Sequence, residues 1–369
     1  MPRQRHPFHP PRRRDASAHL ERAERGGGAA ARWSVAALRG AVARGARYAA
    51  GLVAALTVAV PAPARAWDDV GHMSIALIAW ERLSPATRAT AIRLLRAAPS
   101  DAGLAQLRPN AGGPEARDRA LFARAATWPD IVKDRRERAR FERYNRGHWH
   151  YDELFWRVDA AGRPVAVPEL RGNPEGASER IVRFTATVAD RQRPDAQRGI
   201  ELAWLLHLVG DIHQPLHTSS RVTAAEPRGD RGGNGVRLGS TNLHAVWDDA
   251  LDRTPGRRRA GEGRGGRGGG RPAGGADARL ARAEYVAGRL TRAYPAARLG
   301  AAVADTVVAS WAAAGVRTAQ QVAYSAEIGD GGPHVPEGYR DRVRAAAEPA
   351  AVLAGYRLAA LLERVLGGR

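Results

Sequence analysis

The chain contains no cysteine among its 369 residues. A disulfide framework is therefore excluded, and so is any metal site with thiolate ligands. If the protein binds a metal, the ligands must come from histidine, aspartate or glutamate side chains. The positions of these three residue types thus become the first feature to follow along the chain.

Strand patterns are scarce as well. Only residues 165–167 and 235–238 fit a short strand, and together they predict at most a short β-hairpin. Apolar residues instead recur at helical spacing, which predicts one mainly helical, all-α domain over residues 67–369. The expected helical stretches are 70–83, 85–97, 115–126, 177–191, 196–210, 278–294, 306–314, 318–328 and 339–366.

The apolar run at residues 48–60 is too short for a membrane span, which needs roughly 20 apolar residues. It follows several arginines and ends in an Ala-x-Ala sequence at Ala66. This order is typical of a cleavable signal peptide. We therefore expect removal of residues 1–66, a mature chain that begins at Trp67, secretion or export to the periplasm, and no stable membrane association afterwards.

Basic residues outnumber acidic residues, and the formal charge of the whole chain is +20. The first 66 residues carry twelve arginines and three acidic residues, so the rest of the chain has a formal charge of +11. A basic surface suggests a polyanionic partner, although an arginine-rich composition alone would also produce this excess. Residues 254–276 are rich in Gly and Arg and predict a flexible surface loop, either idle or in contact with nucleic acid.

Histidine and aspartate occur twice at a spacing of four residues, as His207 with Asp211 and as His244 with Asp248. On a helix this spacing places both side chains on one face, about one turn apart. Each pair lies in an apolar stretch, where burial of an imidazole and a carboxylate is costly unless a cation compensates. One pair is a common structural arrangement, but two pairs favour a metal site, with zinc preferred over manganese or iron.

Four more positions are candidates for the same site. Pro215 bends or ends the first of these helices, so His217 can face a neighbouring metal. Asp130 follows a proline in a bend, where it can be either a helix cap or a ligand. His148 and His150 lie two residues apart and compete for one role.

The sequence resembles the S1/P1 nuclease family, which shares its helical fold with the zinc-dependent phospholipases C. The matching motifs span nearly the whole chain after residue 66: Trp67 with Gly71-His72, Trp128-Pro-Asp130, Trp149-His150-Tyr151, His207 to Asp211, Gln214 to His217, Gly232-Gly-Asn234, Asn242 to Asp248, and 354–362. Fungal members carry disulfides and this chain has none, so it looks like a bacterial branch.

The resemblance implies a centre of three zinc ions. One would be held by Asp130, His150, His207 and Asp211, a second by His217, His244 and Asp248, and a third by His72, Asp211 and both the amino group and the carbonyl oxygen of Trp67. An α-amino group ligates a metal only when it is free and deprotonated, so the third site would require cleavage after Ala66. The extra histidines, His148, His213 and His334, are not expected to bind the metal. They should either support the ligands around it or lie in loops at the surface.

The resemblance also implies an activity, namely endonucleolytic hydrolysis of single-stranded DNA and RNA to 5′-phosphate products, together with 3′-nucleotidase activity, by a monomer. Asp130 and Lys133 are the expected catalytic side chains, with Lys133 stabilising charge on the phosphate. Tyr151, Glu153 and Asn234 are expected to bind the substrate. Glu153 follows a second acid where the family usually has an apolar residue and then Asp, and Asn234 fits a turn equally well.

Two other functions stay open at this stage. A phospholipase C would use the same fold and zinc cluster on a lipid phosphodiester, but Tyr151 and the charge of +11 favour nucleic acid. A secreted zinc-binding or nucleic-acid-binding protein without catalysis is the second alternative. The presence of every expected ligand position counts against it.

Overall fold

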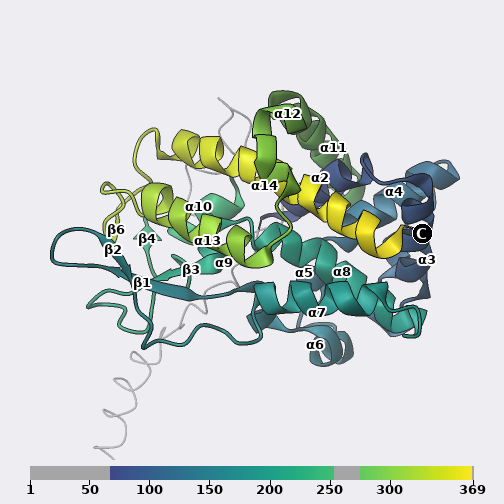
Figure 1. The fold of residues 1–369 in the computed structure, drawn as a ribbon, viewed down its shortest axis with the longest axis horizontal. Helices are drawn as coiled ribbons and strands as arrows, with labels where there is room; N and C mark the ends of the chain where they lie inside the picture. Colours follow the sequence, from purple (N-terminus) through teal and green to yellow (C-terminus); the bar gives the residue numbers. More distant parts are fainter. Residues whose placement is uncertain (1–66, 253–274, 368–369) are drawn as a thin grey trace, which may run out of the picture. The chain divides into compact units, whose positions relative to one another are not determined.

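Helices form most of the fold, and two small sheets lie beside them (Figure 1). The structure is a computed structural model that describes residues 67–252 and 275–367. The signal peptide predicted at 1–66 lies outside the described residues. So does the predicted Gly/Arg loop, apart from its last two residues, where a helix begins.

The mainly helical fold class predicted from the sequence is confirmed. The α-helices are α2 (Asp69–Trp80), α3 (Pro85–Ala97), α4 (Pro114–Ala125), α5 (Trp128–Ile131), α6 (Arg138–Tyr144), α7 (Ala177–Ala189), α8 (Asp195–Asp211), α9 (Pro215–Thr218), α10 (Leu243–Asp248), α11 (Ala276–Ala293), α12 (Ala296–Leu299), α13 (Val308–Thr318) and α14 (Tyr339–Leu366). Shorter turns are η1 (Ser100–Ala102), η2 (Ala105–Leu107), η3 (Gly147–His150), η4 (Gly300–Ala304) and η5 (Ala319–Ala323).

Two predicted helices, 85–97 and 339–366, have the observed bounds, whereas the helix predicted at 318–328 is wrong. Only the five-residue π-helical turn η5 follows α13 there. The start of α3 has a simple physical cause: Pro85 occupies the first turn, and the Ser84 side chain accepts a hydrogen bond from the amide of Thr87.

The strand content exceeds a single hairpin. Strands β1 (Leu154–Val158), β2 (Pro164–Ala166) and β3 (Ser219–Arg221) form one sheet in the order β2-β1-β3. Strands β4 (Arg237–Leu238), β5 (Thr241–Asn242) and β6 (Gly331–Gly332) form the other, in the order β5-β4-β6. The two strands expected from the sequence therefore lie in different sheets and do not pair with each other.

Helix α8 lies at the centre of the packing. It contacts α2, α3, α5, α7 and α14, and its residues from Leu202 to Asp211 are all buried, as expected of a helix that is apolar on every face. A Cβ atom at Gly199 would lie 2.1 Å from the Leu94 carbonyl oxygen, so glycine permits the close approach of α3. Helix α14 is long and apolar enough to cross a membrane by length and composition, but 67% of its apolar window is buried in the fold.

Candidate metal centre

All eight side chains that were expected to bind metal lie together around the C-terminal end of α8. None is more than 7% exposed. They form three groups whose possible ligand atoms lie within 4.8 Å of one another: His72, His207 and Asp211; Asp130, His150 and His207; and His217, His244 and Asp248. The structure thus brings these eight residues together, and their role as metal ligands stays a prediction.

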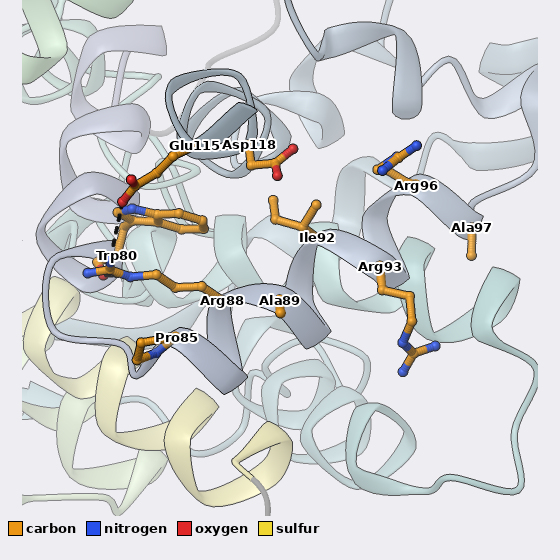
Figure 2. Close-up of a pocket in the computed structure, with 10 residues that line it drawn as sticks. All are labelled: Trp80, Pro85, Arg88, Ala89, Ile92, Arg93, Arg96, Ala97, Glu115 and Asp118. Carbon is orange, nitrogen blue, oxygen red and sulfur yellow. Dashed lines mark hydrogen bonds and ion pairs between the residues drawn. The ribbon is translucent and has the colours of Figure 1, made fainter. Parts of the chain in front are cut away.

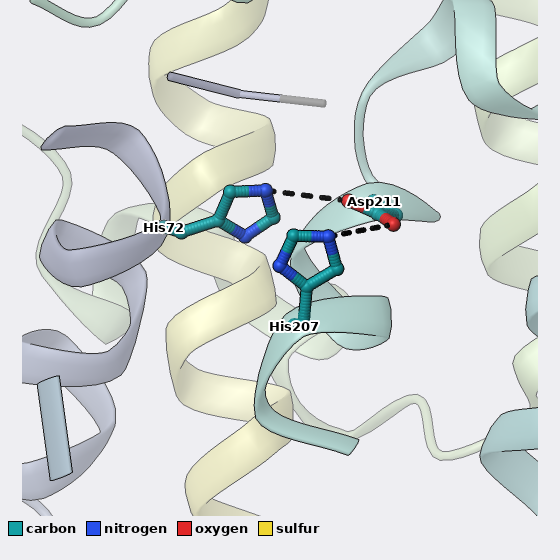
Figure 3. A group of neighbouring side chains, drawn as sticks. All are labelled: His72, His207 and Asp211. Atoms are coloured by element: carbon teal, nitrogen blue, oxygen red, sulfur yellow. Dashed lines mark ion pairs between the residues drawn. The ribbon is translucent and has the colours of Figure 1, made fainter. Parts of the chain in front are cut away.

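The first group joins α2 to α8 (Figure 3). The rings of His72 and His207 stack with their centroids 3.9 Å apart. The two oxygens of Asp211 face different histidines: Oδ1 lies 3.3 Å from Nε2 of His72, and Oδ2 lies 3.3 Å from Nε2 of His207. Asp211 is therefore placed to connect neighbouring positions of the centre, as the resemblance implied.

Three histidines share one orienting contact. In His207, His217 and His244, Nδ1 lies 2.7 Å from a backbone carbonyl oxygen, which can only accept. The acceptors are the carbonyl oxygens of Ala126, His150 and Gly232. Each Nδ1 therefore carries the proton, and each Nε2 keeps a lone pair directed into the site, which is the arrangement typical of metal-ligating histidine.

Several buried ring nitrogens of the centre form no hydrogen bond with the described residues. They include Nε2 of His150, His217 and His244 and both ring nitrogens of His72. A buried polar atom without a partner costs about 1–3 kcal/mol, so a cluster of them is unfavourable unless a ligand completes it. Imidazole nitrogens together with carboxylate oxygens are the ligand set that zinc prefers in a protein without cysteine. The residues present therefore fit the implied metal.

The three carboxylates differ in their electrostatic surroundings. Burial raises the pKa of Asp248 well above its usual range, and only a 2.8 Å hydrogen bond from the Gln214 amide opposes this. Burial would also raise the pKa of Asp211, but the histidines around it, first His207, hold that pKa well below its usual range. Asp248 thus lacks positive charge nearby, and a bound cation would supply it.

Burial acts on the histidines in the opposite sense. It lowers the pKa of His150 and of His244 to about 3, and that of His217 to about 4. Repulsion by Lys133 adds to the effect at His150, and repulsion by His217 adds to it at His244. These rings are therefore neutral at physiological pH, which is the state that binds a metal.

Asp130 and Lys133 form a close pair at the edge of the centre. Nζ of Lys133 lies 2.6 Å from Oδ1 of Asp130, and both side chains are largely buried. Burial alone would raise the pKa of Asp130, but Lys133 and then His207 lower it below its usual range. The side chain of Asp130 therefore faces the centre and does not cap a helix. Lys133 is also the only lysine in the chain, whose other basic residues are arginines.

Trp67 lies against the first group. It is fully buried, and its indole Nε1 donates a 3.0 Å hydrogen bond to the carbonyl oxygen of Gly210. A Cβ atom at Gly210 would come within 2.8 Å of Nδ1 of His72, so this glycine lets Trp67, α8 and His72 approach one another. The next amide, of Asp68, donates to the Asp248 carbonyl oxygen at 3.1 Å.

Two buried groups at the centre were not singled out from the sequence. Gln214 donates to Asp248 and accepts a 2.6 Å hydrogen bond from the Leu216 amide, which holds the turn before α9. Asp230 lies in the loop before Gly232 and is 1% exposed. Its side chain accepts hydrogen bonds from three donors: the amides of Arg221 and Gly233, and the hydroxyl of Tyr324. Its place before two glycines was the only local signal of this role.

Of the three expected substrate-binding residues, Tyr151 contacts the centre, Glu153 lines a cavity, and Asn234 lies in a turn. Tyr151 stacks on the ring of His217, with centroids 4.5 Å apart, so one of its faces is already in contact with the centre. Glu153 has a left-handed backbone with φ of 53° and lines a cavity of about 380 Å³. Asn234 donates a 2.8 Å hydrogen bond to the Arg231 carbonyl oxygen, as a turn residue would.

The adjacent acid, Asp152, points away from this cavity. It accepts hydrogen bonds from the amide and the hydroxyl of Ser178, at the start of α7. Of the two neighbouring acids, only Glu153 therefore lines the cavity.

The extra histidines lie outside the three groups. His213 is buried, but Nδ1 donates to the Val209 carbonyl oxygen at 2.8 Å, and Nε2 accepts from Nη1 of Arg357 at 2.8 Å. Both of its ring nitrogens are thus used. His148 pairs with Glu175 at the surface, and His334 is exposed.

The fold and the site define a mainly helical protein whose buried histidines and aspartates can hold more than one metal ion. The model of the S1/P1 Nuclease family matches residues 67–367. The chain belongs to the S1/P1 nuclease family, and the resemblance noted in the sequence is confirmed.

Two plant proteins are similar over parts of the chain. Endonuclease 4 of Arabidopsis thaliana is 26% identical over 208 residues, which cover 50% of this chain and 55% of that protein. Endonuclease 3 of Arabidopsis thaliana is 44% identical over 54 residues, or 14% of this chain and 16% of that protein. The matches thus span about half of one relative and a smaller part of the other.

Proposed function

We propose that this protein is a zinc-dependent nuclease that cleaves single-stranded DNA and RNA endonucleolytically, leaves 5′-phosphates, and also removes phosphate from 3′-nucleotides. The observation that carries the proposal is the set of three buried ligand groups: the first two share His207, and Oδ2 of Asp211 in the first lies 4.0 Å from Nδ1 of His217 in the third. Membership of the S1/P1 nuclease family supports the same reaction class. We further propose export of the chain and cleavage after Ala66, so that Trp67 becomes the first residue.

Different residues of the chain would hold the metal ions and contact the phosphate. The second group with Asp211 would hold one zinc ion, the third group would hold another, and His72 and Asp211 of the first group would hold a third together with the amino terminus of Trp67. When bound, zinc lowers the pKa of water to about 7 and neutralises the charge that develops on a phosphodiester. Lys133, next to Asp130, places a further positive charge at the edge of the centre, where it can contact a phosphate oxygen.

The substrate side of the proposal rests on Tyr151 and Glu153. An aromatic ring beside the metal ligands can contact an unstacked base of any kind, and a base is accessible in this way in single strands. The pKa of Glu153 is raised by burial, so its carboxyl group can exchange hydrogen bonds with a base edge in the cavity of about 380 Å³.

One observation favours a second candidate. The same cavity is lined mostly by apolar side chains, including Phe155, Val167 and Leu170. An acyl chain would fit such walls as well as a base does, so hydrolysis of a phospholipid is the alternative reaction for the same metal centre. The arginine excess of the chain argues for the nucleic acid.

A side-by-side assay separates these functions. Protein that starts at Trp67 is loaded with zinc, its zinc content is counted, and its activity is measured on single-stranded DNA, RNA, 3′-AMP and phosphatidylcholine. We expect hydrolysis of the first three substrates and none of the lipid. Full zinc occupancy without nucleotide hydrolysis would contradict the nuclease, and lipid hydrolysis alone would establish the alternative.

A further inference from the structure

A second charged cluster lies toward the N-terminal end of α8, away from the metal ligands. A cavity of about 260 Å³ opens there, lined by Thr90, Arg93, Arg191, Arg198, Val365 and Leu366. Arg198 precedes His207 by nine residues on the same helix, so the cavity lies roughly 14 Å from the metal centre along the helix axis. It is therefore a separate site.

The buried member of this cluster is Arg198, which is 4% exposed. Its Nε and Nη2 donate to the carbonyl oxygen of Val188 at 3.1 and 2.9 Å, and its Nη1 donates to Oδ1 of Asp195 at 3.0 Å. These bonds hold the end of α7 against the start of α8. These bonds explain why Arg198 is buried here, but they do not explain why Arg93 and Arg191 also border the cavity.

The other two arginines are more exposed and form fewer hydrogen bonds and ion pairs. Arg93 forms an ion pair with Asp195, the same carboxylate that Arg198 uses. Arg191 is exposed, and within residues 67–252 and 275–367 it makes no hydrogen bond or ion pair. Three guanidinium groups thus border one small cavity, and two of them, those of Arg93 and Arg198, share the carboxylate of Asp195.

This arrangement leaves an excess of positive charge in a confined space. Burial lowers the pKa of Arg198, and repulsion by Arg93 and Arg191 lowers it further. The other nearby acid, Asp190, lies 3.4 Å from Arg193 and is partly compensated by it. An anion in the cavity would relieve this repulsion, and guanidinium groups match the oxygens of a phosphate in a bidentate manner.

We propose that this cavity binds a phosphate group, with Arg93 and Arg191 as its direct donors and Arg198 as the buried charge behind them. The larger neighbouring cavity, of about 820 Å³, shares Arg93 but differs in character. Figure 2 shows Arg88 extended along Trp80 toward Glu115, whereas Arg93 points away from this pair. The larger cavity also carries two carboxylates, so the phosphate site is confined to the smaller one.

The phosphate has two possible sources, a free phosphate ion or a phosphodiester of a single-stranded chain whose scissile bond lies at the metal centre. The second source rests on the proposed nuclease function, and the first does not. Binding of inorganic phosphate therefore tests the site itself. The dependence of KM on substrate length tests which source supplies the phosphate.

The test uses the zinc-loaded chain and the double variant Arg93→Gln/Arg191→Gln. Arg198 is left in place because its loss would leave the Val188 carbonyl without its donors and could prevent folding. The matched control is Arg183→Gln/Arg317→Gln, which removes the same charge from two exposed arginines that form no ion pair within the described ranges. Inorganic phosphate is titrated by calorimetry, and phosphate bound at the metal centre is measured separately as competitive inhibition.

We expect the double variant to bind inorganic phosphate at least tenfold more weakly at this cavity, with unchanged zinc content and unchanged inhibition at the metal centre. The control should bind phosphate as the parent chain does. Unchanged binding in the double variant would overturn the site. An equal loss in the control would also overturn it, because net charge alone would then explain the effect.

The source is decided with a single-stranded 20-mer and a 3′-mononucleotide. If the site takes a phosphodiester, the KM of the 20-mer rises at least tenfold in the double variant, whereas kcat and the KM of the mononucleotide stay the same. If only phosphate binding is lost, the site serves free phosphate. If the parent chain hydrolyses neither substrate, the nuclease proposal fails while the phosphate titration still decides the site.

Discussion

The hydroxyl of Tyr324 donates a 2.7 Å hydrogen bond to Oδ2 of Asp230, and both groups are buried. The other oxygen of Asp230 accepts from the amide of Gly233 at 3.1 Å. Gly232 lies between Asp230 and Gly233 in the sequence, and its carbonyl oxygen accepts from Nδ1 of His244 and so orients that ring. Tyr324 and Asp230 therefore help to position His244, an expected metal ligand, through a loop that is far from Tyr324 in sequence.

Replacement of Tyr324 by phenylalanine removes this hydrogen bond and leaves a buried carboxylate oxygen unpaired. We expect a loss of about 1–3 kcal/mol in the free energy of unfolding. Because contacts that orient ligands typically change metal affinity by 10–100-fold, zinc should also bind more weakly at the group that contains His244. Denaturant unfolding and zinc titration check the two effects. Tyr285→Phe, at an exposed tyrosine, is the control. Full zinc affinity in Tyr324→Phe would show that the contact has no positioning role.

Lys133 provides a second prediction because it is the only lysine in the chain. Loss of one preorganised positive group at a reacting phosphate costs roughly 100- to 1,000-fold in kcat. We expect this loss in Lys133→Ala, with unchanged zinc content, and a smaller loss in Lys133→Arg, which keeps the charge. Steady-state kinetics with metal analysis measures both. Normal kcat in Lys133→Ala would remove the residue from the mechanism.

His207 and His213 allow a matched comparison of two buried histidines near the same helix end. His207 belongs to two ligand groups, whereas both ring nitrogens of His213 are engaged by Val209 and Arg357. We expect His207→Ala to lose zinc and activity. His213→Ala should keep its zinc and lose stability, by about 1–3 kcal/mol, because Arg357 loses a buried partner. Metal analysis and thermal unfolding distinguish them, and equal loss of zinc in both would mean that the ligand set is wrong.

Spacing in the sequence was sufficient for only part of this centre. His207 with Asp211 and His244 with Asp248 were predicted because residues four apart share one helix face. By contrast, His72 and Asp130 reach the site through the packing of α2 and α5 against α8. No local pattern specifies such packing, so these positions depended on the family resemblance.

The prediction of helices from local sequence patterns is limited in the same way. The bounds of α3 were predictable because Ser84 and Pro85 mark its start. The helix expected at 318–328 was wrong although Ala319, Ala323 and Ile328 are buried at nearly helical spacing. The π-helical turn buries Ala319 and Ala323 and then ends, and the tertiary contact of Tyr324 with Asp230 follows directly after it. Apolar spacing over a short segment cannot distinguish these two outcomes.

The zinc ion expected at the third group, His217, His244 and Asp248, should be the last to compete with protons at its histidines as pH falls. Protons compete with zinc for a histidine below that residue's pKa, which is about 6.5 when unperturbed. Burial lowers the pKa of His244 to about 3 and that of His217 to about 4, so competition at these two rings should begin only near these values. Burial would also lower the pKa of His207, but Asp211 and Asp130 raise it, so zinc at that ring should be lost at higher pH. Zinc remaining after dialysis at a series of pH values measures this, and release of all zinc in one step near pH 6.5 would contradict the neutral, buried state of His217 and His244.

The amino terminus provides the last prediction, because Trp67 is buried beside His72 and Gly210. An α-amino group can join the first ligand group only if Trp67 begins the chain, whereas one further residue turns that nitrogen into an amide that cannot coordinate readily. We expect three zinc ions in protein that starts at Trp67 and two in protein that keeps Ala66.

Metal analysis of the two forms checks this count. Trp67→Phe with a free amino terminus is the control: it loses the indole hydrogen bond to Gly210, at a cost of about 1 kcal/mol, but should keep all three ions. Because an α-amino group titrates near pH 8, occupancy of the third position should also rise with pH between about 6 and 8 in the Trp67 form alone. Equal zinc content in both forms at every pH would show that the amino terminus is not a ligand.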